Sequence, residues 1–226
     1  MKKKIRIQKY LSNKGICSRR KAEEFILKGY IYLNGEVVTE LGTTCDPLND
    51  SVKLSSEANE LLATFSYIKY YKPRGIVTHS KQDGEKEIKD IIDFKYRHCA
   101  PIGRLDKESE GLILLTDDGV FAKKCLNHET PHARQYTIKV SKPLSDEAIL
   151  ELESGMMILG KKTKPCSIKK ITPLTYQVTL YEGKNRQIRR MIQKVGNMVM
   201  KLKREQFGPI NIGSLKPNEV AVINKF

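Results

Sequence analysis

Apolar residues near the start of the chain recur at helical spacing, which predicts two short helices. The recurring positions are Ile7, Tyr10 and Leu11 in the first helix, and Ala22, Phe25 and Ile26 in the second. Ser18 is a favourable N-cap for the second helix, and Gly29 ends it. We expect these two helices to pack their apolar faces against each other.

The pattern then changes to the two-residue alternation of strands. Asn34-Gly35 lies between Ile31–Leu33 and Glu36–Val38, which predicts a β-hairpin with a tight turn. Ser51–Leu54 can supply a further strand, and the small polar run Ser55–Glu60 is interpreted as a linker. The first domain is therefore predicted to span residues 1–60.

Residues 63–226 mix strand-like and helix-like segments without a regular strand–helix–strand order. Tyr67–Tyr71 is a predicted strand that ends in the turn Lys72–Gly75. Gly111–Thr116 is a predicted buried strand, closed by a turn at Asp117–Gly119. Alternating Tyr176, Val178 and Leu180 predict another strand.

Two more helices are expected, one capped by Ser145 and one capped by Asn185. Their apolar positions are Ala148, Ile149 and Leu152 in the first, and Ile188, Met191, Ile192 and Val195 in the second. Gly196 would end the second helix. The fold class is therefore α+β: a small helical and β-hairpin domain, then a domain with a largely antiparallel mixed sheet.

Charge narrows the choice of partner. The 226 residues contain 41 Lys and Arg against 26 Asp and Glu, a net charge of +15, which favours a polyanionic partner. No apolar run is long enough to span a bilayer, so we expect no membrane association. The five cysteines are dispersed without a C-x-x-C motif, which is typical of reduced thiols in the cytoplasm.

Basic residues crowd both predicted N-terminal helices. They are Lys9, Lys14, Arg19, Arg20, Lys21 and Lys28. A solvated helix surface is the simplest explanation for one such run. Because the run recurs on both helices with almost no acid before Glu23, we favour a face that contacts phosphates.

One short motif suggests a metal that we do not expect. His128-Glu129-Thr130-Pro131-His132 fits the zinc-protease pattern H-E-x-x-H, which requires a helix. Pro131 is incompatible with that helix, so we interpret the stretch as a polar loop and expect no metal site.

Arg104 and Asp106 lie together on a loop before the buried strand. Spacing alone favours a structural salt bridge. In the last predicted helix, Arg189 lies at the edge of the apolar face, where an arginine usually has an anionic partner, while Arg186 and Arg190 point away from it. An arginine near a half-buried Asp106 would keep that carboxylate ionised.

Residues 8–38, QKYLSNKGICSRRKAEEFILKGYIYLNGEVV, resemble the small RNA-binding domain named after small-subunit ribosomal protein four. Three further motifs, YYKPRGIVT (70–78), GRLDKESEGLILLTDDG (103–119) and EGKNRQIRRM (182–191), resemble bacterial ribosomal-RNA pseudouridine synthases of the small-subunit synthase A group. Residues 156–170 are more similar to members that act on the large subunit, especially large-subunit synthase F. The resemblance implies a catalytic domain over residues 63–226.

The resemblance also implies roles for individual residues. Asp106 matches the catalytic aspartate, Arg189 its paired arginine, and Tyr136 a tyrosine that stacks on the uracil. Ile188 matches a residue lining the uracil pocket, and Arg104 one that touches the RNA or fills the place of the flipped base. Arg186 and Arg190 are expected to contact RNA. Where family members often have Lys two residues before the tyrosine, this chain has Arg134.

The expected activity is isomerisation of uridine to pseudouridine in structured ribosomal RNA, by a cytoplasmic monomer without cofactor or metal. The target base must leave the stack to be reached. Whether the aspartate attacks as a nucleophile or assists elimination stays open. Two alternatives remain: a non-catalytic RNA-binding assembly factor, and an aspartate-based metal phosphotransferase, for which Asp117 and Asp118 would be the additional acids.

Overall fold

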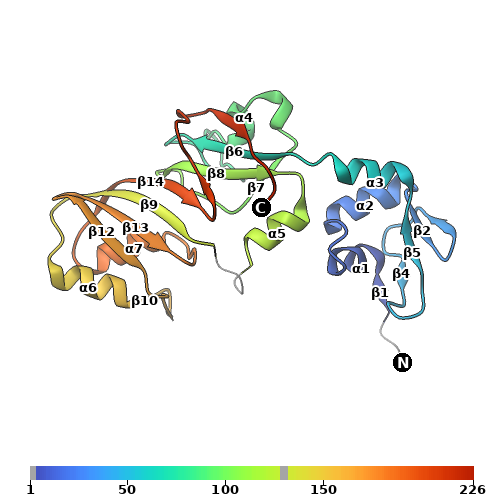
Figure 1. The fold of residues 1–226 in the computed structure, drawn as a ribbon, viewed down its shortest axis with the longest axis horizontal. Coiled ribbons are helices and arrows are strands. Elements are labelled where there is room, and N and C mark those ends of the chain that lie inside the picture. The colour runs from blue at the N-terminus through green and yellow to red at the C-terminus, as the bar shows by residue number, and fades with distance from the viewer. Residues whose placement is uncertain (1–3, 128–131) are drawn as a thin grey trace. The chain divides into compact units, whose positions relative to one another are not determined.

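The computed structural model describes residues 4–127 and 132–226, and the chain divides into two compact units. One unit contains residues 1–66 and 116–124, and the other contains residues 67–115 and 125–226. Elements up to Ala63 are β1 (Ile5–Arg6), α1 (Ile7–Asn13), α2 (Arg19–Leu27), β2 (Ile31–Leu33), β3 (Glu36–Val38), β4 (Thr44–Cys45), β5 (Val52–Leu54) and α3 (Ser56–Ala63) (Figure 1).

The two predicted N-terminal helices and the hairpin are confirmed. Ser18 Oγ accepts a hydrogen bond from Lys21 N at 3.2 Å and caps α2. The helices bury a shared core with the hairpin: Ile7, Leu11, Ala22, Phe25, Ile26 and Ile31. Asn34 and Gly35 both have positive φ, 54° and 94°, as the tight turn between β2 and β3 requires.

The predicted linker at Ser55–Glu60 is wrong, because α3 occupies it. Ser55 Oγ accepts from Ala58 N at 3.2 Å, Glu57 lies in the first turn, and Ala58 is fully buried. The serine and acid that made the run look like a flexible linker are therefore a helix N-terminus.

The chain continues with a larger set of elements. They are β6 (Tyr67–Lys72), α4 (Ile88–Ile91), a 3-10 turn η1 (Phe94–Tyr96), β7 (Ala100–Pro101), β8 (Glu110–Thr116), α5 (Gly119–Cys125), β9 (Arg134–Val140), α6 (Asp146–Ser154), β10 (Met157–Ile158), β11 (Lys161–Lys162), β12 (Ser167–Thr172), β13 (Thr175–Leu180), α7 (Gln187–Lys194), β14 (Val199–Phe207), β15 (Ile210–Asn211) and β16 (Val220–Val222). The predicted turn at Asp117–Gly119 is in part wrong, because Gly119 begins α5 and Asp118 Oδ1 accepts from Phe121 N at 2.9 Å.

Among the described residues, the central sheet has nine strands, in the order β12-β13-β9-β14-β8-β6-β16, with β15 beside β14 and β7 beside β8 (Figure 1). Strand pairs β12–β13, β13–β9, β9–β14 and β16–β6 are antiparallel, whereas β14–β8 is parallel. The prediction of a largely antiparallel mixed sheet is confirmed.

Strand β8 approaches β14 closely at Gly111. Gly111 has φ +104° and pairs with Arg204, and a Cβ at this position would overlap the Arg204 backbone. Tyr176, Val178 and Leu180 of β13 are buried as their alternation predicted, and Ile188, Met191 and Ile192 of α7 join them in one apolar core.

In the part of the chain that the structure describes, no helix combines the length and apolar character needed to cross a bilayer.

Candidate active site

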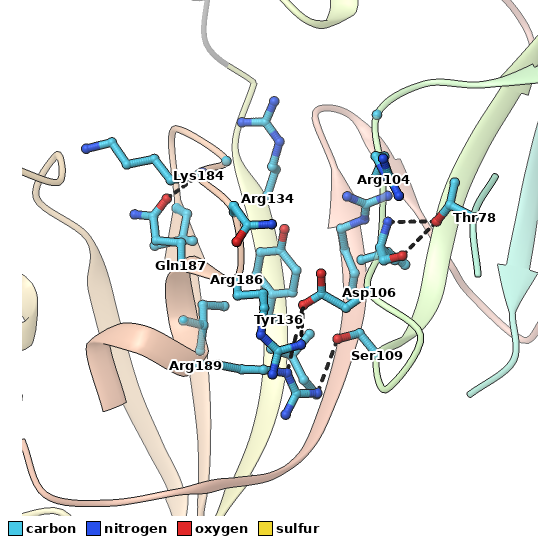
Figure 2. A pocket seen from close by; sticks show the side chains of 18 of the residues that line it. Thr78, Arg104, Asp106, Ser109, Arg134, Tyr136, Lys184, Arg186, Gln187 and Arg189 are labelled. Atoms are coloured by element: carbon cyan, nitrogen blue, oxygen red, sulfur yellow. Dashed lines mark hydrogen bonds and ion pairs between the residues drawn. The ribbon is translucent and has the colours of Figure 1, made fainter. Parts of the chain in front are cut away.

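A cavity of about 580 Å³ lies at one face of the sheet, where β9 and β14 meet two loops (Figure 2). The loop before β8 contributes Arg104, Leu105, Asp106 and Ser109, and the loop and first turn of α7 contribute Lys184, Arg186, Gln187, Ile188 and Arg189. Tyr136, Arg134, Arg204 and Phe207 line it from the strands. The cavity therefore gathers residues from motifs that are far apart in the sequence.

Asp106 lies at the centre of this arrangement, with 31% of its side chain exposed. Its Oδ2 atom is 3.6 Å from Arg186 Nη1 and 3.9 Å from Arg189 Nε. Figure 2 shows both ion pairs on one carboxylate oxygen, with none drawn to the other. Two guanidinium groups thus hold one side of a partly exposed carboxylate.

The backbone on either side of Asp106 is held by hydrogen bonds. Leu105 N donates to Thr78 Oγ1 at 3.0 Å, and Thr78 Oγ1 donates to Leu105 O at 2.7 Å (Figure 2). Ser109 N donates to Asp106 O at 3.0 Å and closes the turn. Because Thr78 is 2% exposed, water cannot replace these bonds.

Lys72 supports the same loop from beneath. This lysine is fully buried, and its Nζ donates to Ser109 O at 2.7 Å and to Pro73 O at 2.9 Å. Burial lowers the pKa of Lys72 to about 8, although nearby carboxylates, Asp106 foremost, oppose the shift. The positive charge at the base of the loop is therefore stabilised by carbonyl oxygens and by Asp106 at longer range.

Arg189 joins three segments of the chain. Its Nη1 donates to Val199 O at 3.2 Å, and its Nη2 donates to Glu108 O at 3.0 Å and to Ser109 Oγ at 3.3 Å. Burial, followed by the charge of Arg186, lowers the pKa of Arg189, and Asp106 opposes this shift. The predicted arginine thus lies beside Asp106 and also fixes the loop that carries it.

The prediction that Arg186 points away from this region is wrong. Helix α7 begins at Gln187, so Arg186 rather than Asn185 is its N-cap, with φ 50° and ψ 33°. The helical wheel used for the prediction does not apply to a residue outside the helix. A left-handed backbone at Arg186 turns its side chain toward Asp106.

Hydrogen bonds hold the loop that contains Arg186. Lys184 N donates to Gln187 Oε1 at 3.0 Å, and Gln187 Nε2 donates to Glu182 Oε1 at 2.9 Å. Glu182 Oε1 also accepts from Lys164 N at 2.9 Å. Gln187 is 4% exposed, so the inner end of this network is buried and supports the cavity wall.

The remaining residues of the predicted pocket are also present in the cavity. Tyr136 is 8% exposed and Ile188 5%, while Arg104 is exposed at the rim. Sequence reasoning missed several contributors, among them Thr78, Ser109, Gln187 and Arg204. Thr78, Ser109 and Gln187 lie within motifs singled out above, but their contacts depend on partners elsewhere in the fold.

The residues predicted to contact RNA outside the cavity differ in their surroundings. Lys9, Lys14, Arg19 and Arg20 are exposed on α1, α2 and the loop between them. Lys21 and Lys28 instead pair with Glu24 at 3.1 Å and 2.8 Å. Arg190 donates from Nε to Asn185 O at 3.2 Å and does not line the cavity.

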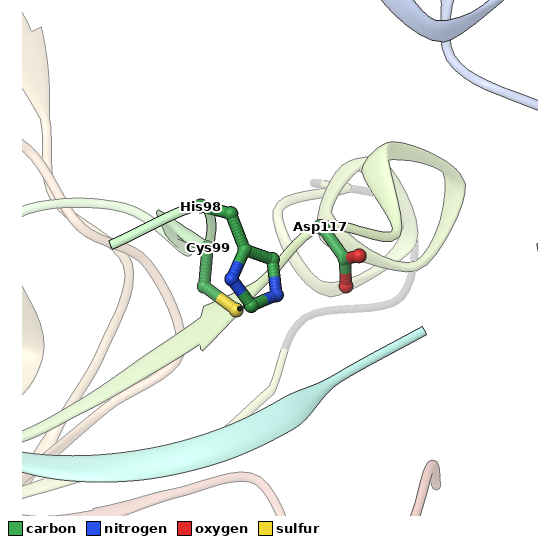
Figure 3. Close-up of side chains that lie close together, drawn as sticks. All are labelled: His98, Cys99 and Asp117. Atoms are coloured by element: carbon green, nitrogen blue, oxygen red, sulfur yellow. Dashed lines mark hydrogen bonds between the residues drawn. The ribbon is translucent and has the colours of Figure 1, made fainter. Parts of the chain in front are cut away.

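The possible metal motif at residues 128–132 lies, apart from His132, outside the described residues. His132 has its ring 5.7 Å from that of Phe207. Elsewhere, Cys99 Sγ is 3.5 Å from His98 Nε2 (Figure 3).

In a comparison with known proteins, two family models match different parts of the sequence. The family model described as RNA pseudouridylate synthase matches residues 66–194, and the S4 domain model matches residues 5–52. A crystal structure of a pseudouridylate synthase, 23% identical in sequence, superposes with a TM-score of 0.71 over 97% of this chain and 96% of that one. That likeness supports the fold.

Two curated relatives are more similar in sequence. The dual-specificity RNA pseudouridine synthase RluF of Escherichia coli (strain K12) is 39% identical over 223 residues, which cover 95% of this chain and 74% of the relative. The ribosomal large subunit pseudouridine synthase B of Bacillus subtilis (strain 168) is 36% identical over 217 residues, or 93% and 88% of the two chains. These names do not support the small-subunit synthase A label, and they agree with the likeness to synthase F.

Proposed function

Because this chain belongs to the RNA pseudouridylate synthase family, we propose that it isomerises specific uridines of ribosomal RNA to pseudouridine, with Asp106 acting on the reacting nucleotide. The observation that carries this proposal is the placement of Asp106 in a cavity, with Arg186 and Arg189 on one of its oxygens. The second oxygen is then available to the substrate.

The reaction breaks the bond between ribose C1′ and uracil N1, and joins C1′ to uracil C5. The hydrogen at C5 leaves as a proton and N1 takes up a proton, so no redox change occurs and atoms balance without a further co-reactant. A carboxylate can attack C1′, attack the base, or remove a proton during elimination. In each case it must be ionised and fixed in direction, which the arginines and the anchored loop provide.

Other residues of the cavity have roles that follow from their chemistry. Tyr136 offers an aromatic face on which a flipped uracil can stack, and Ile188 offers an apolar wall. Arg104 at the rim can contact the RNA backbone or occupy the space left by the flipped base. The cavity of about 580 Å³ has room for one nucleotide.

We further propose that residues 1–60 bind structured RNA as a separate domain, followed by a catalytic domain over residues 63–226. The S4 match over residues 5–52 and the exposed basic residues of α1 and α2 support this. The name of the Bacillus subtilis relative favours large-subunit RNA, and the dual-specificity name of the Escherichia coli relative favours a second RNA substrate. We propose that the protein acts as a cytoplasmic monomer.

Mapping pseudouridines in all RNAs of a strain lacking this gene tests the proposal. We expect one or a few sites to disappear from ribosomal RNA, and to return when the wild-type gene is restored. An unchanged pseudouridine map, combined with tight binding of ribosomal RNA by the purified protein, would instead support the non-catalytic assembly factor.

A further inference from the structure

Two arginines on neighbouring strands, Arg134 and Arg204, line the cavity that holds Asp106. Arg134 is paired with Phe207, and Tyr136 is paired with Arg204, across β9 and β14. Paired residues of antiparallel strands project to the same side of a sheet. All four of these residues line the cavity, so both guanidinium groups belong to its wall.

Within the described residues, Arg204 is a buried charge without an anionic partner. The residue is 3% exposed, its Nε donates to Leu112 O at 2.6 Å, and its Nη2 makes no hydrogen bond. Its guanidinium carbon lies 5.7 Å from the Phe207 ring centre. Arginines that are almost fully buried are normally paired, so an unpaired one requires an explanation.

Arg134 adds a second positive charge beside the first. Its guanidinium carbon lies 5.1 Å from the centre of the same Phe207 ring, and its Nη1 donates to the His132 carbonyl oxygen at 3.4 Å. Burial lowers the pKa of Arg134 and the charge of Arg204 lowers it further, while Tyr136 and the carboxylate of Glu182 oppose the shift. Among the residues that the structure describes, neither arginine has a carboxylate oxygen within 4.0 Å.

A neutral uracil could supply a carbonyl acceptor to one guanidinium but could not offset two positive charges. A phosphate supplies negative charge and several acceptor oxygens, and arginine matches its geometry with two parallel hydrogen bonds. Arg134 is half-buried and is the more accessible of the two arginines, whereas Arg204 is almost fully buried. The site therefore fits an anion that touches Arg134 and is held by the charge of both.

We propose that Arg134, together with the buried Arg204, forms an anion subsite in the cavity wall that binds a backbone phosphate next to the target uridine. Arg134 is then a substrate-positioning residue, and Arg204 stabilises the bound phosphate through its charge. The subsite itself rests on the geometry of the two arginines, and only the RNA as its occupant rests on the proposed function.

The first experiment tests the subsite without catalysis. Inorganic phosphate is titrated into full-length protein, and the arginine Nε–Hε signals are followed by NMR at constant ionic strength. We expect saturable shifts of the Arg134 and Arg204 signals, which Arg134→Gln abolishes. Arg97 provides a matched control, because its guanidinium also lies over a phenylalanine, 5.5 Å from the Phe94 ring centre, but outside the cavity.

Arg97→Gln should leave the phosphate titration unchanged. If the Arg134 and Arg204 signals do not shift saturably, or if Arg97→Gln has the same effect as Arg134→Gln, the anion subsite is wrong. Arg134 is chosen over Arg204 because Arg204 also bonds to β8, so its loss could disturb the fold.

The second experiment identifies the occupant. Uncharged methylphosphonates replace single phosphates around the mapped uridine in a substrate fragment. We expect wild-type protein to lose affinity at one position, about tenfold, and Arg134→Gln to show no further loss at that position. The variant's salt slope, log Kobs against log salt, should be shallower by about 0.7–0.9, the value for one phosphate contact.

If every methylphosphonate weakens wild type and variant equally while phosphate still binds, the anion is not an RNA phosphate. If Arg134→Gln lowers kcat with unchanged phosphate coupling and salt slope, Arg134 acts on the base, and the proposal is overturned. Arg134→Lys should restore the salt slope, but only part of the affinity, because an ammonium lacks the two parallel donors.

Discussion

The Thr78 hydroxyl makes two hydrogen bonds with the Leu105 backbone: it accepts one from Leu105 N at 3.0 Å and donates one to Leu105 O at 2.7 Å. These bonds connect the first catalytic-domain motif to the residue directly before Asp106. Both groups are enclosed, with Thr78 2% and Leu105 6% exposed. The direction of the Asp106 side chain therefore depends on a threonine that does not touch it.

Thr78→Val should lower kcat by about tenfold to a hundredfold while leaving RNA affinity nearly unchanged, because a displaced carboxylate loses its alignment. Leaving Leu105 N and O without partners should also lower the free energy of unfolding by about 1–3 kcal/mol. Thr78→Ser keeps the hydroxyl and should retain most of kcat. Single-turnover kinetics measure kcat separately from binding. A Thr78→Ser variant as impaired as Thr78→Val would show that packing, not hydrogen bonding, matters here.

Arg186→Gln should lower kcat/KM by about tenfold or more, because Arg186 is one of two cations on Asp106 Oδ2. Arg190→Gln should have a smaller effect, since Arg190 bonds to Asn185 and does not line the cavity. Steady-state assays of both variants at one salt concentration make the comparison. Equal losses would indicate that both arginines act only through general attraction of RNA.

Lys72 predicts a pH dependence of stability. The native pKa is about 8, whereas that of the unfolded lysine is 10.5. Below pH 8 both states carry the proton; between the two values only the unfolded state keeps it, so the free energy of unfolding rises with pH.

Lys72→Met removes this titration. The difference in free energy of unfolding, wild type minus variant, should rise by up to about 3 kcal/mol between pH 8 and pH 10.5. Urea unfolding at several pH values measures it. A difference that stays flat or falls across this range would show that Lys72 is not held with a depressed pKa.

The N-terminal basic residues divide into paired and unpaired sets, which predicts unequal roles. Neutralising Arg19 and Arg20 should flatten the salt dependence of RNA binding more than neutralising Lys21 and Lys28, which already pair with Glu24. Filter binding over a range of salt concentrations compares the two double variants. The reverse order would place the phosphate-contacting face elsewhere on the helices.

Local signals in the sequence were sufficient for much of the fold. Ser18, Ser145 and the Asn34-Gly35 turn were placed correctly because capping and turn formation involve only neighbouring residues. The alternation of Tyr176, Val178 and Leu180 likewise predicted a strand with one buried face. The polar run after Ser55 was misassigned, because composition alone does not separate a linker from a helix N-terminus.

The site was only partly predictable. The motifs located Asp106 and Arg189, but not the contact of Arg186, which depends on a left-handed backbone that the sequence pattern does not reveal. Thr78 lies 27 residues from Leu105, and Lys72 lies 37 from Ser109, so their hydrogen bonds arise only when the sheet brings the segments together. The unpaired guanidinium of Arg204 is likewise a property of packing.

The central claim is that the Asp106 carboxylate performs the reaction. Asp106→Asn replaces one carboxylate oxygen of the side chain by an amide nitrogen. The loop keeps its hydrogen bonds to Thr78, Lys72 and Arg189, so the fold and the RNA affinity should be nearly unchanged. Arg189→Lys should also reduce turnover severely, because an ammonium cannot replace the three backbone and side-chain bonds of the guanidinium. Asp83→Asn, at an exposed acid outside the cavity, is the matched control.

The most direct measurement is the release of tritium to water from RNA labelled at uracil C5, because joining ribose to that carbon expels its hydrogen. Wild-type protein and Asp83→Asn should release label from the mapped uridine at the same rate, and Asp106→Asn should release none above background while still binding the RNA. Release by Asp106→Asn at the wild-type rate would contradict the account.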